Sequence, residues 1–266
     1  MEHDKFMQYG RGLGLWQNPR ESIEPDPIKH FRDDPVYLKP VSQGYWVDGE
    51  PTIDEMDPKW LKVPRGQLTF DVEGDDVDGS RWFSRVIHWP GGVSGVTIGR
   101  GYDLGQQSDP EADLTKAGID EPLKKWLVGA KGKSGKAAKD YFNSAPSEIK
   151  NAKITRHQQF ILFNTTYNRL ESDVKRICSK ATAIKMYHPN PYTDPDVAWN
   201  NIPQKMKEVL VDLRYRGDYT TESRKAIQRA AYSGDDAGFM SALKNETVWK
   251  NVPNDRFLRR QAYYAK

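Results

Sequence analysis

The apolar positions of the chain separate a proline-rich start from a regularly patterned remainder. Residues 1–66 show no sustained apolar periodicity and hold eight of the seventeen prolines, which interrupt any long helix or strand. We expect an extended arm or linker over 1–66, part of which packs on the body through Trp16, Trp46 and Trp60. The pattern that follows predicts a folded domain over 67–266.

The first part of that domain has the pattern of short strands. Gln67–Val72 alternates apolar and polar side chains, and the range 82–89 is rich in aromatic and β-branched residues. The run Pro90-Gly91-Gly92 predicts a turn, and 93–98 a further short strand. Residues 67–107 are therefore predicted to form a small antiparallel sheet with glycine-rich turns.

Helical patterns dominate from Asp109 onwards. Asp109 is a predicted N-cap, Pro110 follows in the first turn, and Gly118 ends that helix. Thr155 is expected to cap a longer helix, whose apolar face contains Phe160, Phe163, Tyr167 and Leu170. A second such face contains Ile202, Met206, Val209, Leu210 and Leu213, and shorter helices are expected near 221–233, 235–244 and 254–264. A small sheet followed by many helices predicts the α+β class.

Composition limits the classes of protein to consider. No apolar run reaches the roughly 18 residues that a membrane span requires, so we expect no membrane insertion. No apolar run follows Met1, so a carrier other than an ordinary signal peptide is expected if the protein acts outside its maker's cytoplasm. The single cysteine, Cys178, excludes an intrachain disulfide and is expected to be buried. The five histidines form no ligand pair, so neither a metal nor another cofactor is expected.

Charge is distributed unevenly along the chain. Residues 1–66 carry nine Lys/Arg and twelve Asp/Glu, so this part is acidic. Residues 67–266 carry 31 Lys/Arg and 25 Asp/Glu, so the remainder is mildly basic. A mildly basic body suits a polyanionic partner, and on charge alone both nucleic acid and an anionic cell wall fit it.

Two short segments contain residues suited to catalysis. Glu73 follows an apolar stretch and precedes Gly74, and a half-buried carboxyl group there could hold a proton near neutral pH. The second segment runs from Ser94 to Gly105 and is rich in glycine. Leucine stands where a dinucleotide fingerprint would need its third glycine, so we interpret these glycines as hairpin positions that let a substrate approach the backbone.

These segments resemble a known family. Thr97-Ile98-Gly99-x-Gly101 resembles the Thr-x-Gly-x-Gly hairpin of phage-type lysozymes, and the stretch from Trp82 to Asp103 resembles the killing domain of pesticin-like toxins, which are muramidases with a phage-lysozyme fold. Two later stretches agree with this. Residues 155–168 are similar to the central helix of phage endolysins, and 249–256 to the Trp…Pro-Asn-Arg segment near the family's C-terminus. The resemblance covers about 67–266 and leaves 1–66 unexplained.

The resemblance implies a lysozyme-like fold, with a small sheet lobe before a mainly helical lobe, and a role for individual residues. Glu73 stands at the position of the general acid and Thr97 at the threonine that holds the attacking water. Asp103 stands at the second carboxylate of pesticin-like members. Simple phage lysozymes instead carry that aspartate between the glutamate and the threonine, an interval that here contains Asp75, Asp76 and Asp78. These three stay open as alternatives.

The remaining candidates are residues expected to contact the substrate or to pack. Gly99, Arg100, Gly101 and Tyr102 of the hairpin are expected to contact the muropeptide, and His88 to stack on a sugar, although an aromatic there is more often part of the core. Residues 214–218 are expected to end a helix, with contact to the glycan left open. Trp249 and Arg256 are expected to pack the last helix.

The expected chemistry is hydrolysis of the β-1,4 bond between N-acetylmuramic acid and N-acetylglucosamine, without cofactor. Carboxyl groups about 6.5–9.5 Å apart would invert the anomeric centre, and a gap of about 5–5.5 Å would favour a retaining route. The partners expected are peptidoglycan, a cognate immunity protein and an upstream delivery domain, and not nucleic acid. The expected setting is an antibacterial toxin or secretion effector acting in the target's periplasm or cell wall. A phage endolysin and a non-catalytic wall-binding module are the alternatives.

Overall fold

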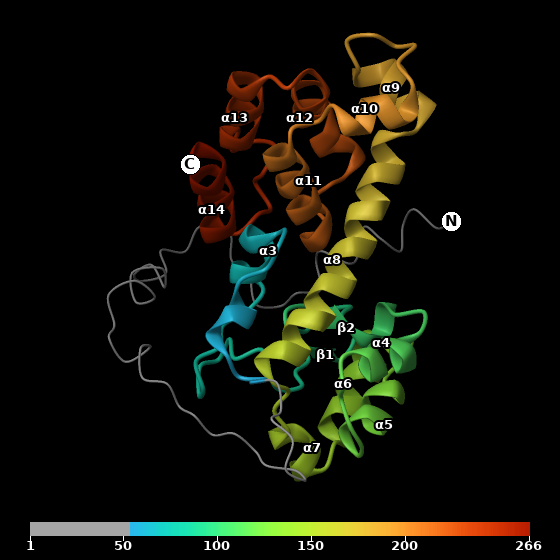
Figure 1. Cartoon of the computed structure of the whole chain (residues 1–266), viewed down its shortest axis with the longest axis vertical. Coiled ribbons are helices and arrows are strands. Elements are labelled where there is room, and N and C mark those ends of the chain that lie inside the picture. Colours follow the sequence, from blue (N-terminus) through green and yellow to red (C-terminus); the bar gives the residue numbers. More distant parts are fainter. Residues whose placement is uncertain (1–53) are drawn as a thin grey trace.

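The structure is a computed structural model that describes residues 54–266. Trp16, Trp46 and most of the predicted arm lie outside the described residues. The described chain is mainly helical and contains one two-stranded antiparallel sheet, which confirms the α+β class (Figure 1).

The elements follow one another in a simple order. Before the long helix, the chain contains η4 (Pro58–Leu61), α3 (Gln67–Val72), β1 (Thr97–Ile98), β2 (Tyr102–Asp103), η5 (Leu104–Gln106), α4 (Pro110–Lys116), α5 (Leu123–Val128), α6 (Gly135–Asn143) and α7 (Ser147–Asn151). The long helix α8 (Arg156–Cys178) leads to the second group, which contains α9 (Ala181–Tyr187), α10 (Pro195–Asn200), α11 (Gln204–Arg216), α12 (Thr221–Ser233), α13 (Asp236–Lys244) and α14 (Asn254–Ala265).

The sheet is smaller than the sequence predicted. Gln67–Val72 is the helix α3 and not a strand, since four of its six side chains are buried and it packs on α11 and α14. An alternation over six residues is too short to separate a strand from a buried helix. The range 82–89 contributes only isolated bridges at Phe83 and His88, and only Thr97–Ile98 of the strand expected over 93–98 forms β1.

The helix predictions are confirmed closely. Asp109 caps α4 by accepting a hydrogen bond from the amide of Ala112, with Pro110 in the first turn. Thr155 caps α8 through a reciprocal capping box with Gln158. The shorter helices expected near 221–233, 235–244 and 254–264 are α12, α13 and α14. The sequence analysis did not predict α5, α6, α7, α9 and α10.

Two hydrophobic cores lie along α8, one at each end (Figure 1). Leu162 packs into the core of the hairpin and α4–α7, whereas Phe163 and Tyr167 pack into the core of α9–α14. The second core also receives Leu68 and Phe70 from α3, far from them in the sequence. Helix α3 therefore joins the C-terminal helices while the chain that follows it returns to the hairpin.

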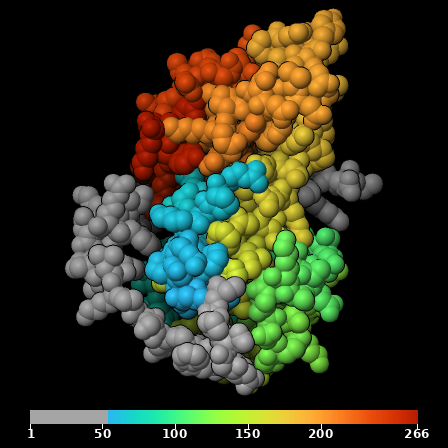
Figure 2. All heavy atoms as spheres, in the orientation of Figure 1, coloured from blue at the N-terminus to red at the C-terminus, as the bar shows by residue number. Residues whose placement is uncertain are grey.

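Residues 54–66 pack on the start of α8. Trp60 lies against His157, with ring centroids 4.2 Å apart, and against Phe160 at 5.3 Å. The amide of His157 donates to the carbonyl of Glu55, and Arg156 donates to the carbonyl of Met56. Figure 2 shows this blue segment lying over the yellow-green α8. Trp60 thus packs part of the predicted arm on the body, as expected.

Candidate active site

The hairpin separates its side chains onto two faces. Thr97 pairs with Asp103, and Ile98 with Tyr102. Directly opposed residues of an antiparallel pair point to the same side of the sheet, and successive residues to opposite sides. Ile98 and Tyr102 are buried in the core of α4–α7. Thr97 and Asp103 therefore share the other face.

Asp103 is a buried carboxylate that two backbone amides bind. Its Oδ2 accepts from the amide of Gly95 at 3.0 Å, and its Oδ1 from the amide of Gly105 at 2.8 Å. Burial raises the pKa of Asp103 to about 6, although both amide hydrogen bonds act to lower it. A carboxylate with this pKa can accept a proton near neutral pH.

Thr97 contacts Gly95, the residue whose amide binds Asp103. Its Oγ1 lies 3.4 Å from the carbonyl oxygen of Gly95, whose amide binds Asp103. Thr97 and Asp103 are therefore linked through one residue, Gly95. A side chain at position 95 would collide with the Asp103 carboxylate, so this arrangement needs glycine there.

Glu73 reaches the hairpin from the end of α3. It is the C-cap residue of α3, and its side chain is only 6% exposed. An ideal Cβ at Gly101 would lie 3.3 Å from Glu73 Oε2, so this oxygen faces the hairpin backbone. Gly101 has a φ of 82°, and its Cβ would also come within 2.7 Å of Tyr215. Glu73 and Tyr215 can therefore lie this close to the hairpin backbone only with glycine at position 101.

Glu73 forms an ion pair with Arg256, in the first turn of α14. The distance from Arg256 Nη1 to Glu73 Oε1 is 2.8 Å, and the Arg256 side chain is 1% exposed. Burial disfavours the charge of Arg256, but Asp212 and Glu73 outweigh this and raise its pKa above the usual value. From the sequence, Arg256 was expected only to pack the last helix, and its pairing with Glu73 was not predicted. The resemblance of residues 249–256 to the family's Trp…Pro-Asn-Arg segment was the sequence feature that pointed to this arginine.

The Glu73–Arg256 ion pair is the first of a series of linked ion pairs, which we call the charge chain. Asp212 accepts from Arg256 Nη2 at 2.7 Å and from Arg260 Nε at 2.7 Å. Arg260 Nη2 donates to Asp218 at 2.8 Å, and Arg216 pairs with Asp218 at 2.5 Å. The chain runs from Glu73 to Arg216 and contains three carboxylates and three guanidinium groups. Its charges balance, which reduces the cost of burying them.

Arg100 binds the backbone on both sides of Glu73. Its side chain is buried, and Nη1 donates to the carbonyl of Phe70 at 2.9 Å and to the carbonyl of Gly74. The guanidinium carbon lies 4.4 Å from the centre of the Phe70 ring. Burial lowers the pKa of Arg100 to about 10, so it is charged at neutral pH. The contact of Arg100 with substrate stays a prediction.

The other predicted hairpin residues have partners within the chain, and their contact with substrate stays a prediction. Tyr102 is buried and donates its hydroxyl to Asp113 at 2.7 Å. His88 bridges Thr97 across the sheet, and burial lowers the pKa of its imidazole. Gly99 has a φ of 63° and donates its amide to the carbonyl of Ser84 at 2.7 Å.

The alternative aspartates have other partners. Asp76 accepts from Arg85 and Arg156, each at 2.6 Å, and its side chain is 4% exposed. Asp75 accepts from the hydroxyl of Ser80, while Asp78 pairs at the surface with Lys153. Asp103 and Asp75 have no ion-pair partner among residues 54–266, and the choice of the second carboxylate stays a prediction.

The remaining predicted features are structural. Gly217, with a φ of 87°, ends α11 as expected, and Trp249 is buried with its indole donating to the carbonyl of Ala242 at 2.8 Å. Cys178 is buried, as expected.

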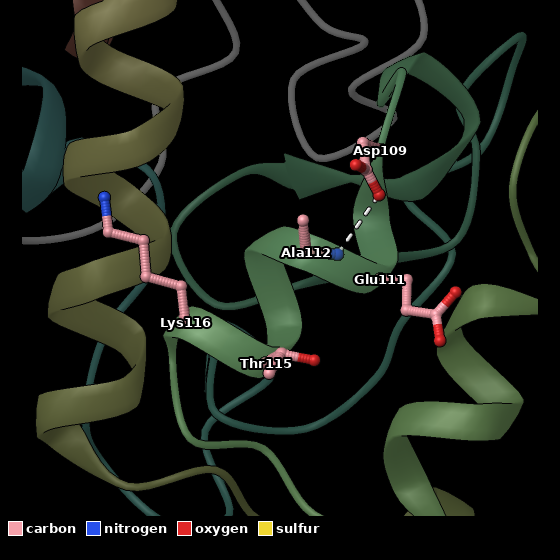
Figure 3. A pocket seen from close by; sticks show the side chains of 5 residues that line it. All are labelled: Asp109, Glu111, Ala112, Thr115 and Lys116. Carbon is pink, nitrogen blue, oxygen red and sulfur yellow. Dashed lines mark hydrogen bonds between the residues drawn. The ribbon is translucent and has the colours of Figure 1, made fainter.

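Residues 54–266 contain no group of His, Cys, Asp and Glu arranged to hold a metal ion, and no helix there combines the length and the apolar surface of a membrane span. A shallow depression on α4 is lined by Asp109, Glu111, Ala112, Thr115 and Lys116 (Figure 3). Its Asp109 is already used as a helix cap.

Residues 66–261 match the model of a family described as a domain of unknown function (DUF8812), and the chain belongs to that family. No curated protein matches the chain. The resemblance to pesticin-like toxins therefore stays a prediction.

Proposed function

We propose that this member of the DUF8812 family is a lysozyme-type muramidase that hydrolyses the β-1,4 bond between N-acetylmuramic acid and N-acetylglucosamine. Glu73 is the general acid, Asp103 the general base, and Thr97 helps to orient the attacking water. The observation that carries the proposal is that the Glu73 carboxylate faces the backbone of the hairpin that carries Asp103, 30 residues later in the sequence.

We propose the inverting route. Glu73 Oε2 faces Gly101, and Asp103 follows two residues later in the hairpin. In inverting enzymes the two carboxyl groups lie about 6.5–9.5 Å apart and leave room for a water molecule beside the base, whereas a gap of about 5–5.5 Å belongs to the retaining route.

The reaction needs one proton donor and one proton acceptor. Glu73 gives its proton to the glycosidic oxygen as the bond from that oxygen to the anomeric carbon breaks. A water molecule attacks the anomeric carbon from the opposite face and gives a proton to Asp103. The raised pKa of Asp103, about 6, matches this role.

Arg256 positions Glu73 for this reaction. Asp212 binds both Nε and Nη2 of Arg256, so only Nη1 faces Glu73. The oxygen Oε1 is fixed by that bond, and Oε2 is left for the leaving oxygen.

The two-core architecture supports a lysozyme-like fold. Among the described residues, α8 contributes to both cores, and Glu73 lies at the end of α3, where the chain leaves the second core and returns to the hairpin. This arrangement agrees with the sheet lobe and helical lobe that the resemblance implies.

The biological setting that we propose is antibacterial. The protein would be delivered to a competitor's periplasm and act on the cell wall, either as an imported bacteriocin or, as we favour, as an effector of a contact-dependent secretion machine. The producing cell would then need an immunity protein that blocks the site. Release as a phage endolysin is the alternative.

A clearing assay on purified peptidoglycan tests the proposal. Glu73→Gln should abolish clearing and Asp103→Asn should reduce it by at least about 100-fold, because each loses a group that transfers a proton. The matched control is Glu148→Gln, an exposed position in α7, which should clear at the wild-type rate. If folded Glu73→Gln still clears, Glu73 is not the acid. If the wild-type protein binds walls without clearing them, the binding module is the correct alternative. NMR of fresh product should show inversion.

A further inference from the structure

The surface next to the hairpin is strongly basic. Residues 122–139 contain six lysines and no acidic residue, and two of these lysines pair with the flanking acids, Lys124 with Glu121 and Lys136 with Asp140. They cover α5, the loop that follows it, and the start of α6, on the lobe that holds the hairpin (Figure 1). Lys125, Lys131, Lys136 and Lys139 are exposed. We call residues 122–139, with Trp89 and Tyr141, the lysine face.

The lysine face is continuous with the candidate site. The carbonyl oxygen of Lys133 packs so closely on Gly105 that a Cβ there would overlap it, and the amide of Gly105 holds Asp103. The amide of Gly135 donates to the carbonyl of Ser94 at 3.0 Å, just before β1. The basic loop is thus built onto the strands that carry Thr97 and Asp103.

Two lysines of this face sit over aromatic rings beside the hairpin. Lys139 Nζ lies 5.5 Å from the centre of the Trp89 ring, and Lys133 Nζ lies 5.0 Å from that of Tyr141. Within residues 54–266 neither lysine has a carboxylate partner. The rings hold these two ammonium groups without neutralising them, so both are left for an anionic ligand.

We propose that the lysine face binds the carboxylates of the stem peptides of peptidoglycan, an inference that rests on the proposed function. Stem peptides hang from the muramic acid residues of the glycan and carry free carboxylates along a chain of three to five residues. At about 3.3 Å per residue such a peptide reaches roughly 10–17 Å from the sugar. The peptide of a sugar bound beside Asp103 is therefore long enough to reach beyond the hairpin, and the loop of Lys133 packs directly on Gly105 of that hairpin segment. The protein would prefer strands with intact peptides to glycan stripped of them.

The test compares intact peptidoglycan with glycan strands freed of peptides by an amidase. We expect Lys133→Gln/Lys139→Gln to lose about fivefold in cleavage rate on intact material at low salt, and nothing on stripped glycan. The matched control is Lys180→Gln/Lys185→Gln, which removes two exposed lysines at α9 in the other lobe. The wild-type preference should shrink as sodium chloride is added.

Binding gives a readout that does not depend on hydrolysis. Sedimentation of Glu73→Gln protein with intact walls should exceed its sedimentation with stripped walls, and the added Lys133→Gln/Lys139→Gln change should abolish the difference. Equal binding to both materials, or equal losses on both, overturns the inference while leaving the muramidase proposal intact. Failure of the wild-type protein to cleave either material overturns the muramidase proposal, whereas the binding result still decides the role of the lysine face.

Discussion

Asp212 is the residue on which the buried charge chain depends most. Its side chain is 0% exposed and accepts from Arg256, from Arg260 and from the hydroxyl of Thr69. Asp212→Asn keeps the shape of the side chain but removes its charge. Two guanidinium groups, 1% and 3% exposed, would then lie together without the carboxylate between them. Breaking a buried pair in this way costs about 3–5 kcal/mol.

The effect should be large in a melting experiment. A change of 1 kcal/mol moves Tm by about 2–4 °C in a domain of 150–250 residues, so we expect Tm to fall by about 6–20 °C. The control is Asp140→Asn, which breaks a surface pair with Lys136 whose side chains are 57% and 87% exposed, and should cost at most about 1 kcal/mol. Urea unfolding followed by tryptophan fluorescence at pH 7 measures both.

The same variant has a defined dependence on pH. Burial acts to raise the pKa of Asp212, but Arg256 and Arg260 outweigh it and hold that pKa below its usual value. A lowered pKa contributes stability above the unfolded value of about 3.9, and the contribution is lost as pH falls through the folded value. The difference between wild type and Asp212→Asn should therefore be constant from pH 7 to 5 and shrink below about pH 4. A difference under about 1 kcal/mol at pH 7 would refute this account of the charge chain.

Three further predictions concern separate parts of the domain. Gly101→Ala should lower the free energy of unfolding, measured in urea, by about 2–4 kcal/mol, because φ is positive there and the added Cβ would meet Tyr215. Gly79→Ala is the control: φ is similar, no atom lies within 4 Å of the added Cβ, and the expected cost is about 1 kcal/mol. The clearing rate should rise with pH around pH 6 as Asp103 loses its proton, and a flat profile between pH 5 and 7 would contradict its role as base. Cys178 is 0% exposed and burial raises the pKa of its thiol, so it should react with a disulfide reagent only as fast as the protein unfolds; immediate reaction in native buffer would show that it is accessible.

Local signals were enough to predict much of the helical part. The caps at Asp109 and Thr155 and the apolar face from Ile202 to Leu213 act over a few residues, and the structure contains them where the sequence places them. The same is true of the turn glycines, since a positive φ at Gly99 and Gly101 is a local demand. The alternating pattern of Gln67–Val72 gave the wrong prediction, a strand, because burial against helices distant in the sequence makes this segment a helix.

The sequence by itself determined the α+β class, the C-terminal helices and the identity of Glu73, Thr97 and Asp103 as candidates, because these follow from caps, periodicity and a recognisable hairpin. Other contacts depend on the tertiary structure alone. Arg256 pairs with Glu73, which lies 183 positions away in the sequence, and Arg100 donates to the carbonyl of Phe70. Asp76 forms ion pairs with Arg85 and Arg156. Ion pairs between distant segments depend on which helices pack together, and packing is decided by the burial of the whole chain. No local pattern records such a pairing before the chain has folded.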